Sequence, residues 1–254
     1  MRQWKQLKIK LTTQAPFRIG GVKPIPGTTD VDSPVVRLGD KVVVQGTSLK
    51  GAYRAELERY FIDTYFDKIN KKWKNQWLKT CIPADEKTIS PDERKLISEG
   101  FYKYSCEYPR SDGYICPTCY LLGARGLVGF IHVPFLNLTR GNAEPLAFIR
   151  KDRVVETSAR GVHGAIGKFE AIPEGSIFEG IMNVLIQDDV TGWNLGQKRN
   201  LTGSLGDKWL ETNEWNRDKI VNELIINRLQ GIERVGGYIS KGFGLVDVKV
   251  EQRP

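Results

Sequence analysis

The chain has 254 residues, which fits one domain with insertions or two small domains, and 40% of its residues are hydrophobic, enough for a sizeable core. It carries 38 Lys and Arg against 30 Asp and Glu, and the resulting net charge of +8 favours a polyanionic partner. No apolar stretch reaches about 18 residues, so we expect no membrane span, and the start of the chain lacks the apolar core of a signal peptide. We therefore expect a cytoplasmic protein with no membrane partner, whose four cysteines are reduced or metal-bound.

The first third of the chain predicts short strands separated by loops. Lys5 to Thr13 alternates polar and apolar residues and predicts a strand with one buried face. Gly20 and Gly21 follow, either as a plain turn or because the backbone passes close to something bulky. After a loop, the stretch from Asp30 to Val36 predicts a second short strand, and Val42 to Val44 predicts a buried one.

The stretch from Gln45 to Arg54 joins a strand to a helix. Thr47 or Ser48 is a natural N-cap, and a helix N-terminus can hold an anion through its unpaired N–H groups. Lys50 and Arg54 are four residues apart and share one helix face. The stretch suits a polyphosphate ligand, although an ordinary strand-to-helix corner with solvated cations explains it equally well.

A charged and mostly helical pattern from Asp63 to Glu99 predicts an insertion on the main fold. Beyond it, Cys116 and Cys119 form a Cys-x-x-Cys pair with a proline inside, which is typical of a zinc knuckle. Cys106 is the candidate third ligand, and Cys81 is the candidate fourth, which His132 or His163 could replace; four free cysteines are the alternative. A thioredoxin-type redox pair is disfavoured, because we expect no helix to start at the first cysteine of the pair and no strand to run directly into it.

The second half of the chain predicts a hairpin, a helix and a glycine loop. The basic segment before Thr157 and the glycine-rich stretch to Gly167 indicate a protruding hairpin or a surface loop with no partner. Trp209 to Gln230 predicts a helix with one apolar face. The loop from Val235 to Gly244 has four glycines, which let backbone N–H groups approach phosphates closely, and it leads into a last strand.

This element order is the α+β pattern of a ferredoxin-like or RRM-like core with one antiparallel sheet. The aromatic signature of the ordinary RRM is missing from the sequence, so we do not expect bases to stack on the sheet in that way.

Four stretches in order resemble one family, the RAMP superfamily, and within it the repeated backbone subunit of type III CRISPR–Cas effector complexes. The first is Gly20-Gly21 followed by Asp32-Ser33-Pro34. The second, Gln45 to Arg54, is similar to the family motif Pro-Gly-Ser-Ser-Leu-Lys-Gly-x-x-Arg, with Gln45 in place of Pro and Thr47 in place of Ser. The third runs from Asp152-Arg153 to Phe178 and looks like the family's thumb hairpin, and the fourth is the C-terminal glycine loop. The cysteines resemble the zinc-bearing insertions of type III-D and III-E relatives.

The resemblance implies a single palm domain over residues 1–254, a helical and zinc-binding insertion over 63–126, and a thumb hairpin over 148–172. It implies that copies of the subunit, with other type III effector subunits, bind a CRISPR guide RNA and kink its duplex with target RNA at regular intervals. The implied zinc ligands are Cys81, Cys106, Cys116 and Cys119. The implied RNA-binding residues are Gly20, Gly21, Thr47, Ser48, Lys50, Arg54, Lys151, Arg153, Arg160, Gly236, Gly237, Ser240, Lys241 and Gly242.

Cleavage-competent members use one aspartate after the first strand, and its position before Ser33-Pro34 makes that residue Asp32. RNA carries its own nucleophile, the 2′-hydroxyl, so one carboxylate acting as a base or holding Mg²⁺ or Mn²⁺ is sufficient chemistry. Asp30 is the local competitor, and an Asx turn before the proline is the alternative role of Asp32. The alternative functions are an inactive RNA-binding scaffold, a guide-processing endoribonuclease of the same superfamily, and a zinc-ribbon nucleic-acid binder.

Overall fold

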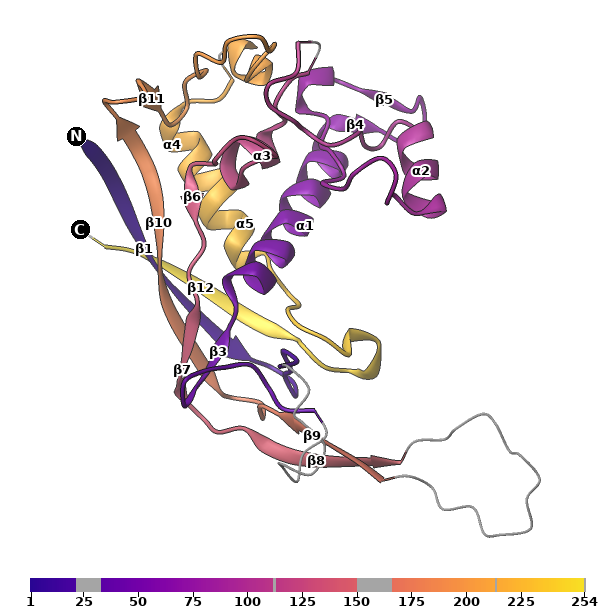
Figure 1. Ribbon diagram of the computed structural model, residues 1–254, viewed down its shortest axis with the longest axis vertical. Helices are drawn as coiled ribbons and strands as arrows, with labels where there is room; N and C mark the ends of the chain where they lie inside the picture. The colour runs from indigo at the N-terminus through magenta and orange to yellow at the C-terminus, as the bar shows by residue number, and fades with distance from the viewer. Residues whose placement is uncertain (22–32, 112, 150–165, 213, 254) are drawn as a thin grey trace.

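A computed structural model describes residues 1–21, 33–111, 113–149, 166–212 and 214–253 (Figure 1). Its first strand is β1 (Arg2–Thr13). Leu7, Ile9 and Leu11 of this strand are fully buried, while the residues between them are half-buried. This alternation follows from the two-residue period of a strand, and it confirms the predicted strand with one face in the core.

One antiparallel sheet organises the molecule. Its strands in spatial order are β12 (Val246–Gln252), β1, β10 (Ile177–Asp188), β7 (Leu136–Arg140), β3 (Lys41–Val44) and β2 (Arg37–Leu38). The short strands β6 (Ile131–His132) and β11 (Trp193–Asn194) also pair with β10. The neighbours of β1 in the sheet are therefore the last two long strands of the chain, which is the split β-α-β arrangement of a ferredoxin-like core. The expected α+β class is confirmed.

Two helical stretches cover one face of this sheet (Figure 1). The first is α1 (Gly46–Tyr65), and the second consists of α4 (Arg217–Lys219), the π-helix η3 (Ile220–Ile226) and α5 (Asn227–Gln230). The buried Tyr53 hydroxyl of α1 donates to the Leu224 carbonyl at 2.8 Å, which satisfies both groups in the core.

Helix α1 begins earlier than the sequence predicts. Its N-cap is Gln45, so Thr47 and Ser48 lie inside the first turn and neither caps the helix. Gly46 fits there because an added Cβ would lie 2.8 Å from the Val133 carbonyl oxygen. No side chain caps this end and no acidic residue lies in the first turn, which leaves the end of α1 electropositive.

The segment after α1 is less helical than its pattern predicts. Its elements are β4 (Phe66–Asp67), β5 (Lys72–Trp73), η1 (Gln76–Leu78), α2 (Pro91–Ser98) and α3 (Pro117–Leu122). Asp67 accepts hydrogen bonds from the N–H groups of Ile69 and Asn70, and this turn reverses the chain where continued helix was expected. The Trp73 ring then packs on Phe66, with its centroid 5.5 Å away.

A buried ion pair fixes the connection between β11 and η2 (Lys208–Thr212). The Arg199 guanidinium donates to both carboxylate oxygens of Asp207 at 2.9 and 2.8 Å, and both side chains are fully buried. A third donor of Arg199 reaches the Val128 carbonyl at 3.1 Å. This pair therefore ties the connection to the segment that directly follows the cysteine-bearing insertion.

The chain between β7 and β10 forms a separate hairpin that extends away from the sheet (Figure 1). It consists of β8 (Glu144–Ile149) and β9 (Ile166–Ala171), paired in antiparallel register from Glu144 with Ala171 to Ile149 with Ile166. The strands thus begin four residues before the expected boundary at 148. In the part of the chain described here, no helix is long and apolar enough to cross a membrane.

Candidate nucleic-acid interface and metal site

Arg18 connects three segments that are far apart in the sequence. Its Nε donates to the Glu170 carbonyl at 3.1 Å and its NH2 group donates to the Ser33 carbonyl at 3.2 Å. Its own carbonyl accepts the Gly237 N–H at 2.9 Å. We call this meeting point, formed by Arg18, Ser33, Phe169, Glu170 and Gly237, the Arg18 junction.

Aromatic rings close the Arg18 junction. The guanidinium carbon lies 5.1 Å from the ring centre of Tyr238 and 5.5 Å from that of Phe169. These two rings meet edge to face at 5.7 Å, and Phe243 lies about equally far from both. Because Arg18 is buried and stacked between rings, its charge holds the base of the hairpin against the glycine loop.

The glycine loop contacts the chain next to Arg18 closely. Gly236 has a φ of +94°, and an added Cβ would lie 2.4 Å from the Arg18 carbonyl oxygen. Gly242 also has a positive φ, of +83°, but open space surrounds it. Between them, Ser240 and Lys241 lie exposed in η4 (Ile239–Lys241). The loop is therefore anchored through Gly236 and presents its tip to solvent.

Glu170 anchors the segment that follows Ser33. Its carboxylate accepts the Val35 N–H at 2.9 Å and two donors of Arg37 at 2.6 and 2.9 Å. The Arg37 hydrogen bond is the main reason that the pKa of Glu170 is lowered, and it outweighs the effect of burial. Gly20 and Gly21 pair with the same segment, since Gly21 donates its N–H to the Pro34 carbonyl.

Several predicted site residues lie outside the described residues. Those in the segment before Ser33 are Asp30 and the candidate catalytic Asp32. Those in the sequence between β8 and β9 are Lys151, Arg153, Arg160 and His163. Their roles remain predictions.

Lys50 and Arg54 share a helix face, as expected, but their surroundings differ. The Arg54 side chain is 14% exposed, pairs with Glu58 at 3.4 Å and donates to Cys119 Sγ at 3.6 Å. Lys50 forms no ion pair within the described part of the chain, and burial together with the Arg54 charge lowers the pKa of its amine. Of the two cations, Lys50 is the one left available to an anion.

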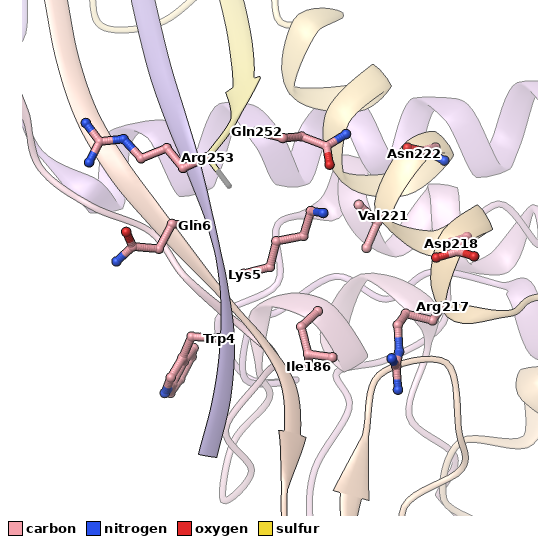
Figure 2. Close-up of a pocket in the computed structure, with 10 residues that line it drawn as sticks. All are labelled: Trp4, Lys5, Gln6, Ile186, Arg217, Asp218, Val221, Asn222, Gln252 and Arg253. Carbon is pink, nitrogen blue, oxygen red and sulfur yellow. The ribbon is translucent and has the colours of Figure 1, made fainter. Parts of the chain in front are cut away.

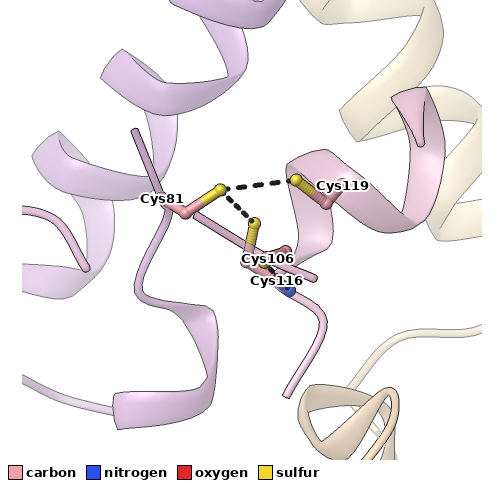
Figure 3. Close-up of side chains that lie close together, drawn as sticks. All are labelled: Cys81, Cys106, Cys116 and Cys119. Carbon is pink, nitrogen blue, oxygen red and sulfur yellow. Dashed lines mark hydrogen bonds between the residues drawn. The ribbon is translucent and has the colours of Figure 1, made fainter. Parts of the chain in front are cut away.

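The four cysteines form one buried cluster (Figure 3). Cys81 comes from the segment before α2, Cys106 follows α2, and Cys116 and Cys119 lie at the start of α3. All four sulfurs lie within 4.8 Å of one another, and Cys81 Sγ is 3.4 Å from Cys119 Sγ and 3.9 Å from Cys116 Sγ. A tetrahedral zinc site with Zn–S bonds of about 2.3 Å places its sulfurs about 3.8 Å apart. The cluster has the size and donor set to bind a metal ion such as zinc.

Positive side chains surround the cluster. A zinc ion with four thiolates has a net charge of about −2, which is costly to bury without compensation. Arg54 reaches Cys119, and Lys103 lies beside Cys106 with its amine donating to the Tyr114 carbonyl at 2.6 Å. Burial lowers the pKa of both cations, but the thiolate charges outweigh it and hold the pKa of each above its ordinary value. Arg54 and Lys103 therefore offset part of the negative charge that thiolates bring to this site.

The structure settles two points about the cysteines. Cys81 belongs to the cluster, whereas the exposed His132 lies against Trp4 with ring centres 4.7 Å apart. The expectation that no helix starts at the first cysteine of the pair is wrong, because Cys116 is the N-cap of α3. Four converging thiols nevertheless suit a metal better than a two-cysteine redox site.

A cavity lies elsewhere, between the ends of β1 and β12 and the start of the C-terminal helical stretch (Figure 2). Its volume is about 670 Å³. Figure 2 shows Lys5 and Gln252 pointing toward the helices, and Trp4 and Gln6 on the opposite side of β1. Trp4 therefore lies on the uncovered face of the sheet.

Sequence reasoning missed Arg18 and Lys103. Each is one basic residue among many, and only their partners make them distinctive: the two carbonyls for Arg18 and the thiols for Lys103. An arginine between Phe17 and Ile19 in a buried segment was the one available signal for Arg18.

The family model of the RAMP superfamily matches residues 10–247. The chain belongs to the RAMP superfamily. The match includes the Arg18 junction, the start of α1 and the cysteine cluster, so the expected family is confirmed. No curated protein matches the sequence.

The RAMP fold is also found among solved structures. One similar chain comes from a cryo-EM structure of the type III-B Cmr-beta complex bound to cognate target RNA. The two chains are 11% identical and superpose with a TM-score of 0.52. The alignment covers 98% of this RAMP chain and 61% of the other chain, so this chain spans about three fifths of the length of that relative.

Proposed function

We propose that this RAMP protein is a guide-RNA-binding backbone subunit of a type III CRISPR–Cas effector complex, and that it cleaves bound target RNA at regular intervals. Its partners would be the guide RNA, target RNA, further copies of itself and other effector subunits. The observation that supports the proposal is the Arg18 junction. It joins the glycine loop, the base of the hairpin and the segment that follows Asp32, so three of the four family stretches meet at one place.

The phosphate-binding part of the proposal rests on exposed backbone and cations. The tip of the glycine loop, with Gly237, Ser240, Lys241 and Gly242, is exposed, and the uncapped start of α1 carries Thr47, Ser48 and Lys50. Unpaired amines and the N–H groups of an uncapped helix start bind phosphate oxygens without reading the bases. In the glycine loop the N–H groups of Gly237 and Gly242 already donate to Arg18 and Ile239, so its glycines would contribute close approach of the backbone to the phosphate. This part of the site would hold the guide uncut.

Cleavage is assigned to Asp32 by the family motif. Asp32 directly precedes Ser33 in the sequence, and Ser33 is fixed at the base of the hairpin by Arg18 and by Glu170, whose N–H donates to the Ser33 carbonyl at 3.0 Å. A carboxylate near this base would accept the proton of the attacking 2′-hydroxyl. A divalent ion such as Mg²⁺ or Mn²⁺, if bound there, would stabilise charge on the phosphate.

The test is target cleavage by the assembled complex with Asp32→Ala. Loss of a general base costs typically about 10²–10⁴ in rate, so we expect cleavage to fall at least about 10²-fold while guide and target binding stay unchanged. Asp30→Ala is the matched control and should cleave normally. Full cleavage by the Asp32 variant would reject the assignment. A wild-type complex that binds target but never cleaves it, with or without divalent metal, would make the protein a scaffold.

We further propose that the cysteine cluster binds one structural Zn²⁺ ion. Metal analysis should find about one zinc per chain, and Cys81→Ser should lower both zinc content and thermal stability. A metal-free protein with unchanged stability would reject this part. Because the cluster lies away from the Arg18 junction in the fold, its loss and the loss of RNA cleavage are separable results (Figure 1).

A further inference from the structure

A second cavity lies between the start of α1 and the loop that joins α3 to β6. Its volume is about 510 Å³, within the usual range of about 300–1,000 Å³ for ligand pockets. Its charged or ionisable lining side chains are Lys50, Arg54, Arg125 and His132, and no carboxylate lines it. The cavity is therefore suited to an anion.

Two of these cations are available to a ligand. Arg54 is engaged with Glu58 and Cys119. Lys50 has no acidic partner in the described chain, and the exposed Arg125 makes only long contacts, of 3.5 Å to Glu107 and 3.9 Å to Asp85. Exposed ion pairs of this kind contribute little, so a phosphate can displace them.

The walls of the cavity are apolar. Leu122, Leu127 and Ile131 line it together with the exposed Val128. The loop is compact because Gly129 crosses Gly123, and an added Cβ on Gly129 would lie 2.3 Å from the Leu121 carbonyl oxygen. Cations beside an apolar wall match the two parts of a nucleotide, the phosphate and the base.

An exposed aromatic pair adjoins the cavity. His132 lines the cavity and its ring also contacts Trp4, which is 37% exposed. His132 pairs across the strands with Asn183, and Asn183 pairs with Gln6 of β1. Gln6 lies on the same side of β1 as Trp4 (Figure 2), so both rings project from the face of the sheet that the helices leave uncovered. Aromatic faces beside a basic groove are what single-stranded nucleic acid uses for base stacking.

We propose that single-stranded RNA passes through this cavity, with Lys50 and Arg125 contacting one phosphate and the Trp4–His132 pair stacking an adjacent unpaired base. This inference rests on the proposed RNA-binding function and adds Trp4, His132 and Arg125 to it. It places stacking at one end of the sheet, at two residues outside any RRM aromatic motif.

The first measurement is photo-crosslinking of the full chain to a single-stranded RNA containing 5-iodouridine, followed by peptide mass spectrometry. We expect crosslinks in the peptides that carry Trp4 or His132. The second is the RNA affinity of variants. The binding free energy of one stacked base corresponds to a loss of RNA affinity of about 5- to 160-fold in Trp4→Ala. Trp4→Phe keeps an aromatic ring and should retain most of the RNA affinity. Tyr104→Ala is the matched control, because Tyr104 is 40% exposed, and it should bind like wild type.

Two further comparisons separate base stacking from phosphate binding. With abasic RNA the difference between wild type and Trp4→Ala should disappear. Arg125→Gln should lower the salt slope of binding by about 0.7 for RNA with and without bases.

The outcomes separate this site from the proposed function. If the wild-type chain binds no RNA, both are overturned. If wild type and Trp4→Ala bind equally well, only this site is overturned. This site alone is also overturned if Trp4→Ala changes the self-association of the chain and leaves RNA affinity unchanged, because the aromatic pair then belongs to a protein contact.

Discussion

Arg54 offers the sharpest test of how this chain departs from its family motif. The motif alone makes Arg54 a phosphate contact, but the structure directs its guanidinium to Cys119 at 3.6 Å and to Glu58 at 3.4 Å. We predict that Arg54→Gln weakens metal binding by the cysteine cluster and hardly changes the salt dependence of RNA binding.

The magnitude follows from the contact. Two unit charges 3.6 Å apart attract by about 5 kcal/mol at an effective dielectric constant of about 20. Arg54 is nearly buried and is shared with Glu58, so desolvation and that ion pair offset much of this attraction. Loss of a group that contacts a metal ligand typically costs about 10- to 100-fold in metal affinity, or about 1.4–2.7 kcal/mol. We expect Arg54→Gln to fall in this range.

The assay is zinc competition against a chelator of known affinity, with RNA affinity measured over a salt series on the same samples. Lys50→Gln is the matched control, because it removes the other cation of the same helix face. It should lower the salt slope by about 0.7 and leave zinc affinity nearly unchanged. Arg54→Gln should give the opposite pattern. The reasoning is refuted if Arg54→Gln keeps zinc affinity within twofold and lowers the salt slope as Lys50→Gln does.

Three further predictions concern stability. Asp207→Ala leaves its buried arginine partner without a counter-charge and should lower the free energy of unfolding in urea by about 3–5 kcal/mol, whereas Glu211→Ala, in the exposed pair nearby, should have little measurable effect. Gly236→Ala should destabilise the protein more than Gly242→Ala. Left-handed backbone strain of about 1–2 kcal/mol applies to both variants, whereas a clash with the Arg18 carbonyl applies only to Gly236→Ala. Equal losses of unfolding free energy would contradict the contact between Gly236 and Arg18. The pKa of Glu170 is lowered in the folded protein, so its carboxylate stabilises the fold above the ordinary pKa of 4.5. This stabilisation is lost as the pH falls below 4.5 toward the lowered pKa. Glu170→Gln should therefore reduce the acid sensitivity measured by thermal melts from pH 7 to pH 3.

Local chemistry in the sequence determined several features of this protein. Alternation in β1, the β-branched run of β3 and the apolar face of the C-terminal helical stretch each follow from periodicity. The Cys-x-x-Cys pair indicated a metal site because two thiolates three positions apart can face one ion. The four ordered stretches were sufficient to indicate the RAMP superfamily, which the family match confirms.

Only the tertiary structure decided which groups meet. Cys81 and Cys119 are 38 positions apart, and sequence spacing could not choose between Cys81 and a histidine as the fourth ligand. The same limit applies to Arg54, because its position four residues after Lys50 is the same whether its side chain contacts a phosphate or a cysteine sulfur. Its role depends on where the insertion folds back onto the helix. Arg18 likewise has no local signature, because its partners are carbonyl groups that every residue carries. Periodicity and motifs specify which groups the chain contains, whereas contacts between distant segments determine what each group faces.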